Sequence, residues 1–138
     1  MKLAQIWNAQ QTLQALLALK KPPKLAYRLM KYWKKVQVEI EACEQLRLKC
    51  VYDAAGVEPP AQVNLDPGSP EYASFMEKFQ EAMQGESDLE WSGVTMDELI
   101  ETLGDQVGNT LSENDLQHLE PFFTAPEPLL KLVEGTQP

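Results

Sequence analysis

The strongest pattern along the chain is an apolar stripe in a stretch without Gly or Pro, which runs from Lys24 to about Tyr52. At about 100° per residue, the apolar side chains fall on one helix face about 100° wide. They are Leu25, Leu29, Tyr32, Trp33, Val36, Ile40, Cys43 and Cys50, with Arg47 as the one charged intruder. The pattern predicts a helix of about 28 residues and about 42 Å, longer than the ~30 Å width of a small domain. Other helices or a second subunit must cover its flank.

A shorter amphipathic pattern precedes this helix, from Lys2 to Lys20. Its apolar residues recur at helical spacing, and Pro22-Pro23 stops the helix before the long one begins. The two segments therefore predict an antiparallel helical hairpin with a tight corner at the prolines. The apolar positions of the first segment are Leu3, Ile6, Trp7, Leu13, Leu16 and Leu17.

A third helix is predicted over Pro70 to Gln84, with Ser69 as its N-cap and a proline in its first turn. Its apolar face is rich in aromatic and Met side chains, so we expect it to pack on the long helix. That face consists of Tyr72, Phe75, Met76, Phe79 and Met83.

Two short segments flanking the third helix have strand-like patterns. Val63 and Leu65 share one face of Gln62 to Leu65, and Leu89 and Trp91 alternate with polar residues in Asp88 to Val94. These segments leave room for a minimal two-stranded ribbon.

The last part of the chain predicts short helices followed by a tail. Thr95 to Glu98 is a capping box, and Ser112 to Asp115 begins a second short helix in the same way. Gly104 and Gly108 read as turn residues. We therefore expect a mainly α (α+β) domain over residues 1–123, with residues 124–138 as a flexible or loosely docked C-terminal tail.

Length and composition agree with one compact domain that needs neither disulfide nor structural metal. The chain has 138 residues, 43% hydrophobic and 24% charged, a size at which roughly two-thirds of the unfolded surface is buried on folding. No apolar run approaches the ~20 residues that cross a bilayer, so we expect a cytoplasmic protein. Cys43 and Cys50 lie about 10.5 Å apart along one predicted helix, too far for a disulfide between them.

The net charge of −9 conceals a division between the two parts of the chain. Residues 1–50 hold ten Lys and Arg against three Asp and Glu, a net of +7, whereas residues 51–138 hold two against eighteen, a net of −16. Lys24, Arg28, Lys31 and Lys35 follow one another at helical spacing beside the apolar stripe. This basic stripe is the candidate site for an anion or a partner. Two readings stay open: the acidic remainder neutralises it within the fold, or it binds an external polyanion.

Residues for other chemistry are sparse. The acidic residues match no calcium-loop spacing, and Asp97, Glu98 and Glu101 suit a helix N-terminus. His118 is the single histidine and has neither a zinc-ligand pattern nor a nucleophile beside it. We therefore expect no catalytic residue, no metal and no cofactor.

The order of elements resembles small uncharacterised proteins encoded by tailed bacteriophages and prophages. The likeness covers about residues 1–100 and concerns element order rather than a chemical motif. It is carried by Lys24 to Leu29 opening the long helix, Tyr52 near its end, the Val63 strand, Glu71-Tyr72 with Phe75 and Phe79, Asp88 to Trp91, and Met96 to Leu99. The resemblance implies a viral gene product in the cytoplasm of an infected or lysogenic bacterium, with a role in assembly or in handling macromolecules.

Together these observations predict a non-enzymatic interaction protein, a phage or prophage accessory or assembly factor that binds another protein or itself. Dimerisation through the excess length of the long helix is part of this prediction. The alternative is a nucleic-acid-binding module that uses Lys24, Arg28, Lys31 and Lys35. No membrane partner is expected.

Overall fold

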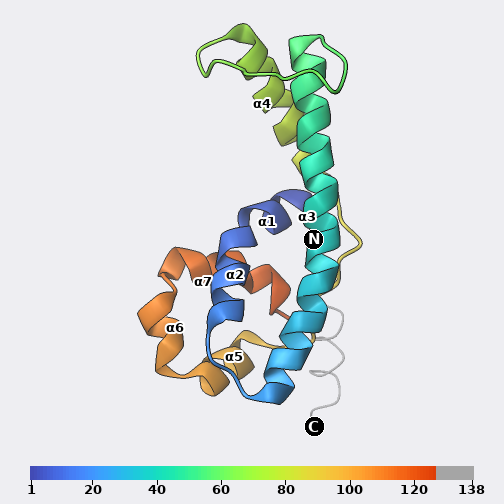
Figure 1. Ribbon diagram of the computed structural model, residues 1–138. Coiled ribbons are helices and arrows are strands. Elements are labelled where there is room, and N and C mark those ends of the chain that lie inside the picture. Colours follow the sequence, from blue (N-terminus) through green and yellow to red (C-terminus); the bar gives the residue numbers. More distant parts are fainter. Residues whose placement is uncertain (127–138) are drawn as a thin grey trace.

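The computed structural model describes residues 1–126, and the predicted tail falls almost wholly outside the described residues. The described part is built from helices joined by loops (Figure 1), which confirms a mainly α fold. No helix of this part is both long and apolar enough to cross a membrane. The elements are α1 (Leu3–Asn8), α2 (Gln10–Ala18), α3 (Pro23–Ala55), α4 (Pro70–Met83), α5 (Met96–Leu103), α6 (Asp105–Thr110), α7 (Glu113–Leu119) and the 3-10 turn η1 (Glu120–Phe122).

The long helix α3 runs through both parts of the molecule (Figure 1). Its 33 residues span about 50 Å at 1.5 Å per residue. Pro23 occupies the first turn, where its missing N–H costs nothing, and Gly56 ends the helix at φ +70°, a left-handed conformation that suits glycine. The signals at both ends are local, which is why the sequence predicted this helix well.

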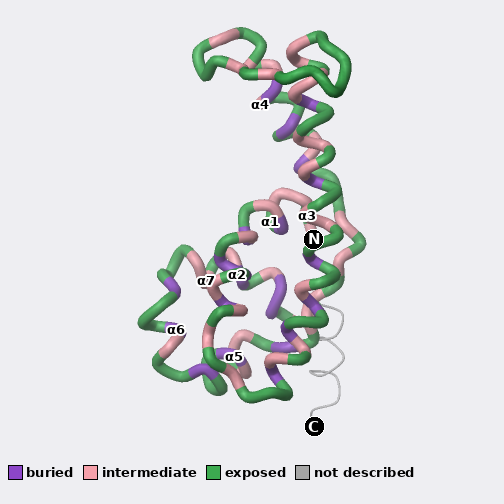
Figure 2. The backbone as a smooth tube through the Cα atoms, viewed as in Figure 1, coloured by how far each residue is buried: buried purple, intermediate pink, exposed green. Residues whose placement is uncertain are grey.

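The molecule has a head and an arm. The head surrounds the N-terminal half of α3 with α1, α2 and the C-terminal helices, and its core contains Ile6, Val36, Leu119, Phe122 and Phe123, each at most 1% exposed. Figure 2 shows these helices bringing their buried positions together beside α3.

The arm is the C-terminal half of α3 with α4 packed along it (Figure 1). Phe75 and Phe79 stack with ring centroids 5.7 Å apart, and they lie in one cluster with Met83, Cys43 and Cys50. Both cysteines are free and buried, and burial raises the pKa of each thiol. The third helix therefore packs on the long helix as its aromatic face predicts.

The first predicted helix is divided at Ala9 into α1 and α2. This division lets α1 serve both clusters: Ile6 is in the head core, while Trp7 meets Phe79 edge to face with centroids 5.7 Å apart. Ala9 itself is fully buried. A short loop through Pro22 then leads α2 into α3, and both α1 and α2 contact α3.

The predicted two-stranded ribbon is wrong for residues 1–126. Gln62 to Leu65 and Asp88 to Val94 lie beyond opposite ends of α4, a helix of 14 residues and about 21 Å, so they cannot pair. The alternating side chains of the second segment pack on helices instead, because Leu89 lies against the head core. The single bridge in this region joins Lys2 to Glu86.

The short C-terminal helices begin where their caps predict. The Thr95 side chain accepts a hydrogen bond from the Glu98 N–H, and the Ser112 side chain accepts one from the Asp115 N–H. The sequence did not predict α6, because Gly108 within it reads as a turn. Val107 on α6 is buried in the head core, so α6 is held by packing that the sequence pattern does not reveal.

Candidate interaction surface

The basic stripe is divided in the structure. Lys24, Lys31 and Lys35 are exposed, and none of them forms an ion pair with another residue of the described chain. The Lys31 ammonium instead lies 5.9 Å from the centre of the Tyr27 ring, a distance within reach of a cation–π contact. Three of the four predicted site residues are thus on the surface, and the fourth is engaged within the fold.

That fourth residue, Arg28, attaches the C-terminal part of the head to α3. Its guanidinium donates to the Glu98 carboxylate at 2.8 Å and to the Gly93 carbonyl oxygen at 2.8 Å. The two charged side chains are about two-fifths exposed. A pair this accessible contributes little energy, but the two bonds fix where the segment before α5 lies. Internal neutralisation therefore reaches one cation of the stripe.

Tyr32, one turn further along α3, makes the second attachment. Its hydroxyl donates to the Glu90 carbonyl oxygen at 2.7 Å, and its ring meets Phe122 edge to face at 6.5 Å. Burial raises the pKa of this phenol well above its usual value, so the hydroxyl keeps the proton that it donates. Arg28 and Tyr32 together hold residues 90–93 beside the helix.

A groove of about 640 Å³ lies between α3 and residues 88–92. The α3 wall carries Arg28, Lys31 and Lys35 together with Glu39, and the other wall carries Asp88 and Glu90. Trp91 is half-buried along the same wall. The groove therefore has one mainly basic wall and one acidic wall, and an extended polyanion lying in it would meet carboxylates as well as cations.

The outward face of α3, where Tyr27 and Val38 also line the groove, carries more apolar surface than the sequence pattern suggested. We call Tyr27, Met30, Val38 and Leu48 the outward stripe; their exposed fractions are 65%, 60%, 66% and 40%. Only Val57 and Ile100 are other exposed large apolar residues within residues 1–126. At about 100° per residue, the four side chains of the outward stripe fall within a sector about 80° wide around the helix axis. This sector points away from the buried face. Its helical spacing is present in the sequence, but Lys34 and Glu41 lie among its apolar positions and make the face read as charged.

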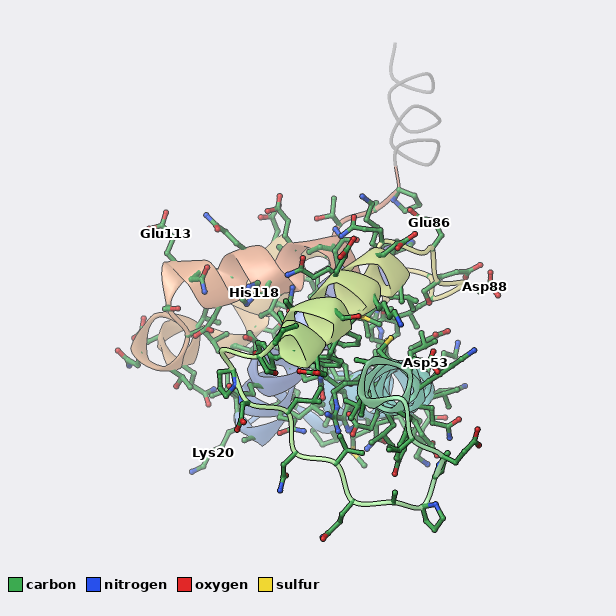
Figure 3. The ribbon with its side chains drawn as sticks, turned by 90° about the horizontal axis from the view of Figure 1, so that it is seen from above. Lys20, Asp53, Glu86, Asp88, Glu113 and His118 are labelled. Atoms are coloured by element: carbon green, nitrogen blue, oxygen red, sulfur yellow. The ribbon has the colours of Figure 1, made fainter. Side chains whose placement is uncertain are left out.

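The remaining candidate groups have structural positions. The Asp115 carboxylate accepts bonds from the Ser112 N–H and the Thr12 hydroxyl, joining α7 to α2. His118 is half-buried on the same helix. Figure 3 shows Glu113 and Asp88 pointing outward from different edges of the molecule. Within the described residues no three His, Cys, Asp or Glu side chains are grouped closely enough to hold a metal ion.

Comparison of the chain with models of protein families, with curated proteins and with solved structures gives no match. The bacteriophage resemblance gains no support from these comparisons. Function must therefore be argued from the surface itself.

Proposed function

We propose that this chain is a non-enzymatic interaction protein that binds a protein surface through the outward stripe of α3. The observation that carries the proposal is the concentration of exposed apolar side chains: four of the six in the described chain are on this one helix face. Exposed apolar area that is grouped on one face marks interaction sites more often than scattered single residues do. An accessory or assembly role in a phage-infected or lysogenic bacterial cytoplasm is proposed from the sequence resemblance alone.

The proposal can be tested by lysine labelling at low protein concentration. The protein is treated with an acetylating reagent in buffer and in a lysate of the bacterium that carries the gene, and labelled sites are quantified by mass spectrometry. Lys34 lies within the outward stripe and Lys31 lies beside it, so we expect a partner to protect them, whereas exposed Lys78 on α4 serves as the reference. Protection should disappear in Val38→Glu. Equal labelling in buffer and lysate, with no protection of these lysines when the protein concentration is raised to near-millimolar, would contradict the proposal.

A nucleic-acid-binding module is the second candidate. The exposed ammonium groups of Lys24, Lys31 and Lys35 favour it. Two observations weigh against it. Arg28 forms an ion pair with Glu98, and the carboxylates of Asp88 and Glu90 line the opposite wall of the groove.

This candidate predicts binding of a single-stranded oligonucleotide that weakens steeply as salt rises, because counterions are released from the backbone. Lys31→Glu with Lys35→Glu should abolish that binding, while Lys78→Glu should leave it unchanged. Binding that is insensitive to the double substitution would remove nucleic acid as a specific ligand of this surface.

A further inference from the structure

We propose that the occupant of the outward stripe is a second copy of this chain, whose α3 packs antiparallel to the first. This inference rests on the proposed function, since it names the partner of the same helix face. Four observations carry it: the charge order along α3, the symmetric placement of its exposed side chains, the opposite charge at paired positions, and the exposure of the outward face.

The charge order along α3 changes sign near its middle. The part before Val38 contains five cations and no acid: Lys24, Arg28, Lys31, Lys34 and Lys35. The part after Val38 contains four acids and two cations, namely Glu39, Glu41, Glu44, Asp53, Arg47 and Lys49. Two parallel copies would place cations against cations. Two antiparallel copies place the basic half of each helix against the acidic half of the other.

The exposed side chains fit the same arrangement. Tyr27 and Leu48 lie at equal distances, about 16 Å along the helix, on either side of a point next to Val38. Lys34 and Glu41 lie about 5 Å on either side of that same point. A two-fold axis there brings Val38 next to its own copy and Tyr27 opposite Leu48 of the second copy. Lys34 then faces Glu41 of the second copy, twice by symmetry.

The helices packed on α3 leave this face exposed, and residues 88–92 border it along the groove that Tyr27 and Val38 also line. The clusters formed with α1, α2 and α4 use α3 residues such as Val36 and Cys43, which are fully buried on the side opposite the outward stripe. Figure 1 shows α1, α2 and α4 on one side of α3, and part of the segment between α4 and α5 on the other side. A second α3 can therefore approach the exposed Tyr27, Met30, Val38 and Leu48 side chains alongside residues 88–92. Because the apolar contact is limited to a few side chains, we expect a weak dimer, with Kd on the order of 10–100 μM.

The test uses a pair of charge-reversal variants. Sedimentation velocity measures the proportions of monomer and dimer for each, from micromolar to near-millimolar protein concentration. Lys34→Glu and Glu41→Lys each place like charges opposite one another at two symmetric sites. Each variant alone should therefore dissociate about ten- to thirty-fold more readily than the wild type. Mixed together, the two variants restore opposite charges at both sites, so the mixture should contain heterodimer. Neither residue makes an ion pair in the single chain, so folding should be unaffected.

A matched pair of apolar substitutions checks the centre of the interface. Val38→Glu should leave the protein monomeric, whereas Ile100→Glu, at an exposed position on α5, should leave dimerisation unchanged. Circular dichroism verifies that both variants are folded.

A strict monomer throughout the concentration range would overturn the second copy as the occupant. If Lys31 and Lys34 were nevertheless protected in lysate, the proposed function would stand with a different protein partner. If neither association nor protection occurred, both proposals would fail. A dimer that tolerates Val38→Glu, or variants that stay monomeric when mixed, would place the interface elsewhere.

Discussion

The hydroxyl of Tyr32 offers the most direct check of how the groove is built. Tyr32 is 8% exposed, and Tyr32→Phe removes the hydrogen bond to the Glu90 carbonyl while it leaves the ring in place. The ring fills the same volume, so no cavity contribution is expected. Glu90 is exposed, so water can replace the lost donor at its carbonyl oxygen. The expected loss is therefore the net value of one hydrogen bond, about 1 kcal/mol of unfolding free energy.

Urea denaturation of dilute protein measures this loss. With an m value of about 2 kcal/mol per M, the midpoint should fall by about 0.5 M, and Tm should fall by about 3–5 °C. Hydrogen exchange should also accelerate in residues 88–93, because one of their attachments to α3 is gone. Tyr27→Phe is the matched control, since that ring is 65% exposed and should change stability by less than about 0.5 kcal/mol. Equal midpoints for Tyr32→Phe and wild type would refute the reasoning.

Three further predictions concern local features. Gly56→Ala should destabilise the protein by about 1–2 kcal/mol in urea because φ is +70° there, whereas Gly68→Ala, in open space without a positive φ, should not. The Ser112 N–H holds the pKa of Asp115 below its usual value, so this carboxylate stabilises the fold above the unfolded-state pKa of about 3.9 and loses its contribution as pH falls below it. Asp115→Asn should therefore flatten the acid limb of thermal stability, and an unchanged limb would count against the assignment. Cys43 and Cys50 should react with a thiol reagent only as fast as the protein unfolds. The labelling rate, measured at increasing urea concentrations, should therefore follow the unfolding rate. Fast labelling of the native protein would disprove their burial.

Local signals explain what the sequence predicted. The boundaries of α3 come from Pro22-Pro23 and Gly56, and that of α4 from Ser69, whose side chain accepts the Tyr72 N–H. Each of these acts within one or two turns of backbone. The pattern of apolar positions on α3 likewise predicted its buried face, because that face is set by helical periodicity alone.

The features that were missed depend on distant partners. Arg28 reads like its Lys neighbours, and its pairing with Glu98, seventy positions away, has no local signature. The alternation around Trp91 does mark a half-buried extended segment, but periodicity does not say whether a strand or a helix covers it. The break at Ala9 has no Gly or Pro to mark it in the sequence, and it follows a helix whose Ile6 and Trp7 contact different clusters.

The placement of the arm has a consequence for folding. The arm is formed by residues from the middle of the sequence, so its contacts between α3 and α4 join residues fewer than about fifty positions apart. The head requires contacts between α2 and α7, which lie roughly a hundred positions apart. Because closing a short loop costs less entropy and is faster, we expect the arm to fold first. During synthesis the head core would stay open until Phe122 and Phe123 emerge. The arm would then be the part that presents a finished surface while the rest of the chain is still being made.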